Sequence, residues 1–250
     1  MKVSIITPSY NSAKTIEDTL RSVADQTYSN IEHIVIDGGS KDGTMNIVKE
    51  YGDSVSKFVS EPDEGIFDAM NKGIKMAAGD IVGILNSDDF YADDDIIEKV
   101  VGEMEKEKVD CIWGDLVYVH PNNTGKVVRK WKSLPYKKGK FQKGWMPPHP
   151  TFFVKKWVYD KYGLFDRRFE RVSADYEIML RFLERYGVKS AYIPEVLVKM
   201  RAGGNSTRNL KQIIIGNWEC YKSWGVNGLK VSPSFIFLKL GRKISQFINK

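Results

Sequence analysis

Cysteine is scarce in this sequence of 250 residues, and long apolar runs are absent. The two cysteines, Cys111 and Cys220, lie far apart and lack the spacing of metal ligands. We therefore expect both thiols to be reduced and buried, as is usual in a cytoplasmic protein. No segment approaches the roughly 20 apolar residues that a transmembrane helix requires. The apolar run after Met1 is too short for a signal peptide, which also favours a cytoplasmic location.

Glycine-rich phosphate loops are missing as well. No G-x-G-x-x-G pattern follows the first expected strand, and no G-x-x-x-x-G-K-[ST] pattern occurs anywhere in the chain. These absences argue against a dinucleotide-dependent dehydrogenase and against a P-loop enzyme. Hydrophobic residues make up 42% of the chain and charged residues 28%, so a packed core is expected and wholesale disorder is not.

The first 95 residues alternate between strand-like and helix-like apolar patterns. Strands are expected at residues 3–7, 31–36, 55–59 and 81–85. Helices are expected between them at residues 13–24, 45–51 and 66–77. The first strand should stop at Pro8. Strands that alternate with helices predict an α/β fold with a parallel sheet and right-handed crossovers.

The pattern changes after residue 95. Helices are expected at 96–104 and 176–182, and strands at 111–119, 190–193 and 196–200. Residues 120–148 are rich in proline, glycine and lysine and predict a long loop, which is typically functional or mobile. The last forty residues look helical and contain many aromatic residues and lysines.

Basic charge is unevenly distributed, although the net charge is only +6. Residues 121–143 contain eight basic residues and no acidic one, and residues 211–250 contain seven basic residues and one acidic residue. In the second region apolar residues mix with lysine and arginine, as in a segment that lies at a membrane surface. A solvated basic surface is an alternative. Nucleic-acid binding is a third, but no nucleic-acid motif occurs and the front half of the chain is acidic.

Two of the expected strands end in aspartate. The second strand leads into Asp37, and the fourth is followed by Asp88 and Asp89. Ionised carboxylates at the end of a buried strand need compensation, and Mg²⁺ or Mn²⁺ suits such hard oxygen ligands. The carboxyl ends of strands in an open α/β sheet are also where ligands bind. The alternatives are an acidic helix N-terminus after the fourth strand, and a turn at Asp37 before two glycines.

Three further candidate site residues could have either a structural or a functional role. Asp175 opens an expected helix, where its charge favours the helix dipole. His149 lies in the sequence Pro-Pro-His-Pro and is either structural or next to a substrate or metal. Gly204 belongs to a Gly-Gly-Asn-Ser turn, whose backbone N–H groups could bind phosphate.

Four motifs in this order make the chain resemble the family 2 inverting glycosyltransferases, which have the GT-A fold. They are Ser-Ile-Ile-Thr-Pro-Ser-Tyr-Asn at 4–11, Ile-Asp-Gly-Gly-Ser-Lys-Asp-Gly-Thr at 36–44, Ala-Met-Asn-Lys-Gly-Ile at 69–74 and Asn-Ser-Asp-Asp at 86–89. Residues 61–71 resemble a branch found in bacterial polysaccharide biosynthesis.

The resemblance implies a GT-A domain at residues 1–208, with a Rossmann-like, mostly parallel α/β sheet flanked by helices. Residues 1–90 would form its nucleotide-binding half and residues 91–208 its acceptor half. Residues 209–250 would form a basic amphipathic helical tail.

The resemblance also assigns roles to matching residues. The nucleotide-binding positions would be Thr7, Pro8, Ser9, Tyr10, Asp37, Ser40 and Asp88. Asp88 would also contact the metal, Mn²⁺ or Mg²⁺, which Asp89 would ligate. Asp175 would be the general base, although Ala174 replaces the glutamate that precedes this aspartate in the family.

Contacts to the sugar and the acceptor are expected from a further set of residues. These are Asp63, Phe67, Lys72, His149, Arg201 and Gly204. Many members of the family carry an arginine where this chain has Met70. Lys72 or Arg201 would then supply positive charge to the diphosphate.

The predicted function is metal-dependent, inverting transfer of a sugar from a UDP-sugar to a hydroxyl of a saccharide or lipid-linked saccharide. We expect a cytoplasmic enzyme with peripheral contact at the inner face of the membrane and no nucleic-acid partner. Two alternatives stay open. A sugar-1-phosphate nucleotidyltransferase would need a basic, glycine-rich N-terminal loop, and a non-catalytic basic adaptor would bind membrane or nucleic acid without a nucleotide sugar.

Overall fold

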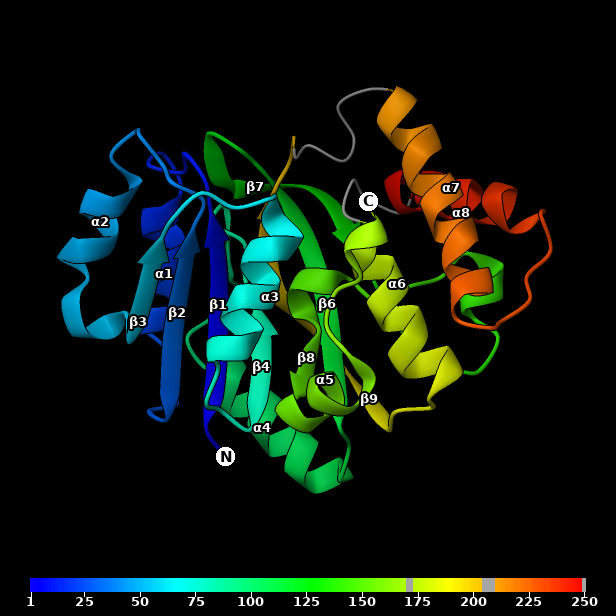
Figure 1. The fold of residues 1–250 in the computed structure, drawn as a ribbon, viewed down its shortest axis with the longest axis horizontal. Coiled ribbons are helices and arrows are strands. Elements are labelled where there is room, and N and C mark those ends of the chain that lie inside the picture. Colours follow the sequence, from blue (N-terminus) through cyan, green and yellow to red (C-terminus); the bar gives the residue numbers. More distant parts are fainter. Residues whose placement is uncertain (170–172, 204–209, 249–250) are drawn as a thin grey trace.

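The computed structural model describes residues 1–169, 173–203 and 210–248 (Figure 1). Its strands build one sheet in the order β3-β2-β1-β4-β8-β6-β9-β5, and β7 pairs with β6 beside this path. The strands are β1 (Val3–Ser9), β2 (Ile31–Asp37), β3 (Lys57–Ser60), β4 (Ile81–Ile84), β5 (Asp89–Tyr91), β6 (Cys111–His120), β7 (Asn123–Trp131), β8 (Phe153–Lys155) and β9 (Ser190–Arg201).

Helices cover both faces of the sheet. They are α1 (Ile16–Ala24), α2 (Thr44–Glu50), α3 (Ile66–Met76), α4 (Ile96–Glu107), α5 (Lys156–Tyr162), α6 (Ala174–Leu180), α7 (Leu210–Val226) and α8 (Phe235–Ile248). In Figure 1, α3 and α5 lie in front of the sheet, and α1 and α4 lie behind it. The chain is therefore a mixed α/β protein in which helices cover a central sheet.

The first half of the sheet is parallel, as the alternating pattern predicted. β1 lies between β2 and β4, and β3 pairs with the outer edge of β2. On β2, Ile34 and Ile36 pack with Ala69 of α3. Val35, which lies between them in the strand, packs with Ile16 of α1 in a separate core. The strand is buried on both faces, which explains its continuous apolar run.

β1 runs to Ser9, two residues beyond the predicted last residue Thr7, because Pro8 interrupts no hydrogen-bond ladder. Pro8 is paired with Ile36 of β2. The carbonyl of Ile6 accepts the N–H of Leu85 on the β4 side, and the backbone of Pro8 faces the same side. The pairing of β4 with β1 ends at Ile6, so the missing N–H of Pro8 forfeits no bond.

The second half of the sheet is mixed and corrects two expectations. Residues 190–201 form one strand, β9, with an irregularity between Tyr192 and Val196, where two strands were expected. Residues 120–148 do not form one long loop, because β7 folds back on β6 as an antiparallel hairpin. The outer side of β7 exposes charged side chains such as Lys126 and Lys130, which is common on edge strands and made the segment look like a loop.

The last two helices pack against α6. The buried ring of Phe235 in α8 lies 5.9 Å from the ring of Tyr176 in α6 and 5.9 Å from that of Trp224 in α7. Cys111 and Cys220 are both buried and unpaired by disulfide, as expected. Within the described part of the chain, no helix combines the length and the apolar character needed to cross a bilayer.

Candidate active site

The carboxyl ends of β1, β2 and β4 meet at one edge of the sheet, at the top of Figure 1. Hydrogen bonds join the turns that follow these strands. The N–H of Asn11 donates to Ser40 Oγ at 2.7 Å, and the hydroxyl oxygens of Ser12 and Ser87 lie 2.8 Å apart. Three of the four motifs that carried the family resemblance, at 4–11, 36–44 and 86–89, therefore share one rim.

Asp37 is buried at the end of β2 and accepts five hydrogen bonds. Its Oδ1 accepts from the hydroxyls of Ser9 (3.1 Å) and Ser40. Its Oδ2 accepts from the Ser60 hydroxyl (2.7 Å) and from the N–H groups of Gly39 (3.1 Å) and Ser40 (2.9 Å). Burial alone would raise the pKa of Asp37, but these donors outweigh it and hold the pKa below its usual value. The charged carboxylate of Asp37 thus fixes the turn after β2. To bind this carboxylate directly, the N–H of a nucleobase would have to replace one of the five donors.

The predicted residues 7–10 divide between core and surface. Thr7 is buried, and its hydroxyl lies 2.9 Å from Nε2 of His33, whose pKa burial lowers to about 4. Pro8 is buried too, whereas Tyr10 is 65% exposed. Thr7 therefore helps to hold β1 against β2, and Tyr10 presents its ring at the rim.

Asp88 and Asp89 lie where β4 leads into β5. Oδ2 of Asp89 accepts from the Asn86 amide at 3.1 Å, and the backbone N–H of Arg201 donates to the same carboxylate. Oδ1 of Asp89 is buried with no hydrogen-bond partner among the described residues. Burial raises the pKa of Asp88, and burial together with the Asp88 charge holds the pKa of Asp89 well above its usual range. This pair of carboxylates lacks sufficient positive compensation.

The two carboxylates fit a divalent cation. A buried oxygen of Asp89 without a partner, beside a second carboxylate, is a set of hard oxygen ligands that suits Mg²⁺ or Mn²⁺. In the ranges that the structure describes, no group of three or more His, Cys, Asp or Glu side chains could hold a metal ion. The other ligands would therefore be water and diphosphate oxygens, as is common for Mg²⁺ at phosphate sites.

Arg201, at the end of β9, lies beside the two carboxylates. Its guanidinium donates to the backbone carbonyl of Asp88 at 2.6 Å and pairs with Asp18 of α1. The guanidinium also lies 5.1 Å from the ring centre of Phe90. The structure thus places Arg201 beside Asp88 and Asp89, and its guanidinium forms an ion pair with Asp18. Gly204, which was predicted to contact the sugar or the acceptor, lies outside the described residues.

Asp175 lies at the start of α6, and its Oδ1 accepts the N–H of Tyr176 at 2.7 Å. His149 is buried near it, and its ring lies 5.5 Å from that of Phe165. Phe165 in turn lies 5.4 Å from Phe67 of α3. Burial lowers the pKa of His149, and the charge of Asp175 opposes this shift. The structure places two of the predicted sugar-side residues, Phe67 and His149, against the ring of Phe165, and the charge of Asp175 reaches His149.

Tyr118 of β6 connects the predicted base with the predicted metal ligands. Burial raises the pKa of Tyr118, the charge of Arg129 lowers it, and the charges of Asp89 and Asp175 raise it. The charges of Asp89 and Asp175 therefore both affect the pKa of the Tyr118 phenol. Arg129 was not among the predicted site residues. It is one of eight basic residues between positions 121 and 143, and nothing in the sequence distinguishes it from the other seven. Only the pairing of β6 with β7 shows that it lies over the Tyr118 ring.

Lys72 and Asp63 lie on the α3 side of the rim. Lys72 forms ion pairs with Glu61 (2.8 Å) and Asp68 (3.3 Å). Asp63 lies close to Gly38, where an added Cβ would meet Asp63 Oδ2 at 2.7 Å. Glycine at position 38 therefore allows the turns after β2 and β3 to touch.

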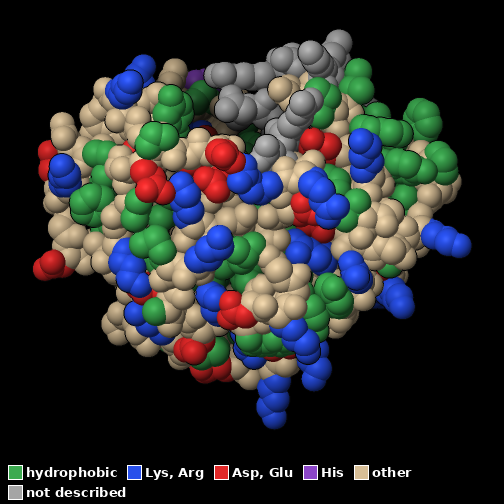
Figure 2. All heavy atoms as spheres, in the orientation of Figure 1, with side chains coloured by type: hydrophobic (Ala, Val, Ile, Leu, Met, Phe, Trp, Pro, Cys, Tyr) green, Lys and Arg blue, Asp and Glu red, His purple; other side chains and the backbone are tan. Residues whose placement is uncertain are grey.

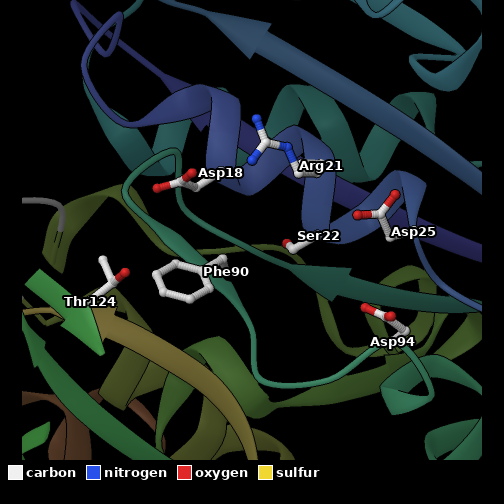
Figure 3. Close-up of a pocket in the computed structure, with 7 residues that line it drawn as sticks. All are labelled: Asp18, Arg21, Ser22, Asp25, Phe90, Asp94 and Thr124. Carbon is white, nitrogen blue, oxygen red and sulfur yellow. The ribbon is translucent and has the colours of Figure 1, made fainter. Parts of the chain in front are cut away.

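A hollow between α1 and β5 is distinct from the carboxylate site (Figure 3). It is lined by Asp18, Arg21, Ser22, Asp25, Phe90, Asp94 and Thr124. Phe90 follows Asp89 in β5, so their side chains point to opposite faces of the strand. Asp18 links the hollow to the site through its pair with Arg201.

Known proteins similar to this chain are glycosyltransferases. The model of "Glycosyl transferase family 2" matches residues 4–162. An uncharacterized glycosyltransferase of Mycobacterium tuberculosis is 35% identical over 182 residues, which cover 72% of this chain and 68% of that protein. A PGL/p-HBAD biosynthesis glycosyltransferase of Mycobacterium bovis is 25% identical over 211 residues, which cover 83% of this chain and 79% of that protein.

Solved structures share the fold. TarS residues 1–349 of S. aureus, in complex with UDP, match with a TM-score of 0.66 and 18% identity over 100% of this chain and 71% of that chain. This chain spans 44% of another TarS chain with the same TM-score. The mannosyltransferase PcManGT of Pyrobaculum calidifontis, in complex with GDP-Man and Mn²⁺, matches with a TM-score of 0.66 and 20% identity over 96% of this chain and 68% of that chain. With the family model matched over more than half of its length, the chain belongs to glycosyl transferase family 2 and is a glycosyltransferase with the GT-A fold.

Proposed function

We propose that the protein transfers a sugar, with inversion, from a nucleoside diphosphate sugar to a hydroxyl group, with Asp175 as the general base. The observation that carries the proposal is the buried oxygen of Asp89, which has no hydrogen-bond partner among the described residues and lies beside Asp88 at the rim that also holds Asp37. Family membership favours sugar transfer over nucleotidyl transfer and over a non-catalytic adaptor.

The reaction needs no covalent nucleophile from the protein. The acceptor oxygen attacks the anomeric carbon on the face opposite the diphosphate. As the new C–O bond forms, the bond from the anomeric carbon to the phosphate oxygen breaks, and its electron pair leaves with the diphosphate. Asp175 takes the proton of the acceptor hydroxyl. The buried ring of His149 and its neighbour Phe165 would help to exclude water beside it.

The turns after β1 and β2 would hold the nucleoside, with Tyr10, Asp37 and Ser40 nearest to the base. UDP is the proposed nucleotide, and the TarS complexes with UDP and UDP-GlcNAc support it. A divalent cation at Asp88 and Asp89 would neutralise charge on the departing diphosphate. The PcManGT complex contains Mn²⁺ together with GDP-Man, which supports the use of a divalent cation.

We propose a saccharide or lipid-linked saccharide at the inner face of the membrane as the acceptor, with residues 209–250 as the membrane-contacting tail. Six large apolar side chains are exposed on the last two helices: Ile214, Trp218, Val226, Phe237, Leu238 and Leu240. Figure 2 shows hydrophobic side chains gathered over α7 and α8. Basic residues such as Lys222 and Lys230 lie on the same segment, which suits an anionic membrane surface.

The substitution Asp175→Asn tests the proposed base. The amide keeps the size of the side chain and cannot take the proton, so release of nucleoside diphosphate from the donor sugar should fall by roughly 10²–10⁴. Affinity for UDP, measured by calorimetry, should stay close to that of the wild type. Asp160→Asn, which alters an exposed carboxylate on α5, is the matched control and should change neither quantity. Equal losses of turnover and UDP affinity in Asp175→Asn would contradict the assignment.

A further inference from the structure

Four residues form one row across the mixed half of the sheet. Asp89 of β5 pairs with Met200 of β9, and Met200 pairs with Tyr118 of β6. Tyr118 pairs with Arg129 of β7. Residues paired across neighbouring strands project from the same face of a sheet. With strands about 4.8 Å apart, the backbone of Tyr118 is about 10 Å from that of Asp89.

The side chain of Arg129 turns back along this row toward Asp89. Its guanidinium carbon lies 3.8 Å from the centre of the Tyr118 ring, and the guanidinium hydrogen-bonds with the Tyr118 side chain. Arg129 is 9% exposed, whereas Lys130, which points to the opposite face of β7, is exposed. Tyr118 lies in the row that leads to Asp89, and the charges of Asp89 and Asp175 both raise its pKa, so the guanidinium lies on the face of the sheet that carries Asp89.

The cations that the sequence suggested for the diphosphate are engaged elsewhere. Lys72 pairs with two carboxylates beside α3, and Arg201 pairs with Asp18. Met70, which stands where many relatives have arginine, is buried in the core. The guanidinium of Arg129 lies on the ring of Tyr118. A guanidinium stacked in this way directs its N–H groups along its own plane, where they match phosphate oxygens in pairs.

We propose that Arg129 binds the diphosphate of the nucleotide sugar and stabilises the negative charge that develops on it as the sugar departs. This inference rests on the proposed function, because the donor brings the diphosphate into this region. Because Arg129 is largely withdrawn from water, its attraction to a diphosphate is screened less than that of an exposed cation. Tyr118 acts as the positioning residue, since its ring and hydroxyl hold the guanidinium in the row that leads to Asp89.

Calorimetric titration of the whole chain at constant Mn²⁺, with UDP and with UMP, tests the assignment. Arg129→Met removes the charge, and the affinity for UDP should fall by about 10- to 100-fold. The affinity for UMP should change far less, because UMP lacks the second phosphate. Lys130→Met removes the same charge one residue along the strand, on the opposite face, and should leave both affinities unchanged. Tyr118→Phe keeps the ring and should weaken UDP binding by a smaller factor.

Three results would overturn the inference while leaving the proposed function intact. These are unchanged UDP affinity in Arg129→Met, equal losses for UDP and UMP, and an equal loss in Lys130→Met. If Arg129→Met fails to fold, Arg129→Gln decides, because it also removes the charge, and normal UDP affinity in this variant would overturn the inference. If the wild-type protein binds none of UDP, GDP and dTDP, the proposed function fails and the inference fails with it. If GDP or dTDP is preferred, that diphosphate and its monophosphate replace UDP and UMP.

Discussion

A buried carboxylate stays charged only where enough donors surround it, and Glu32 shows this near the first strand. Its oxygens accept hydrogen bonds from Ser4, from Lys2 and from the N–H of Ala78, and Lys57 Nζ lies 3.5 Å away. Burial alone would raise the pKa of Glu32, but these contacts lower it from 4.5 to about 2. The carboxylate therefore ties β1 and β2 to the turn before β4.

We predict that Glu32 causes part of the loss of stability in acid. Because its pKa is lower in the folded protein, its stabilisation is complete above about pH 4.5 and disappears as the pH falls toward 2. The full effect is about 3 kcal/mol. Urea unfolding across this pH range should show the loss in the wild type and in Glu50→Gln, which alters an exposed carboxylate. Glu32→Gln should be less stable at neutral pH and less sensitive to acid, and an unaltered pH dependence would refute the assignment.

At the scale of elements, α3 lies directly against β1 because Gly73 puts no side chain between them. A Cβ at this position would meet Ile6 Cγ2 at 2.4 Å. Ile6 is fully buried in a close-packed core, so it has little room to move. The close approach of this helix also places Phe67 against Phe165, beside His149.

Gly73→Ala should therefore destabilise the protein although alanine is the better helix former. Overpacking of this kind costs about 1–3 kcal/mol. Gly102 is the matched control, because it lies in helix α4 and an added Cβ would meet no atom within 4 Å. Gly102→Ala should stabilise the protein by up to about 1 kcal/mol. Thermal unfolding of both variants would show opposite shifts, and a stabilised Gly73→Ala would contradict the packing described for α3.

The parallel half of the sheet could be predicted because β1, β2 and β4 are buried on both faces and the crossover helices have apolar stripes. β7 could not be predicted, because one side of the strand faces solvent. It is held in place by its antiparallel pairing with β6, which the sequence does not reveal. The single strand β9 also escaped prediction, because Pro194 interrupts the apolar pattern where the pairing with β6 shifts its register.

At the scale of the whole molecule, the candidate site depends on contacts between residues far apart in the chain. Asp37, Asp88, Asp89 and Asp175 could be chosen from the sequence, because strand ends and family motifs mark them. Arg129 could not, since its place depends on the β6–β7 hairpin and its ring contact with Tyr118.

The exposed apolar side chains of α7 and α8 give a prediction about membrane contact. Deleting residues 230–250 would also remove the buried ring of Phe235, so surface substitutions are the better test. Trp218→Ser combined with Phe237→Ser should weaken flotation with anionic liposomes and leave the thermal midpoint nearly unchanged. Trp157→Ser, at an exposed site on α5, is the control. Liposome binding that is the same in all three proteins would remove the membrane proposal.

The central claim is that the carboxylates at the rim of the sheet bind a cation and a nucleoside diphosphate together. It is tested most directly by titrating UDP, GDP and dTDP into the wild type and Asp89→Asn, with and without Mn²⁺. We predict that Mn²⁺ strengthens the binding of at least one nucleoside diphosphate to the wild type and has little effect on Asp89→Asn. Binding that is indifferent to both Mn²⁺ and Asp89 would contradict the claim.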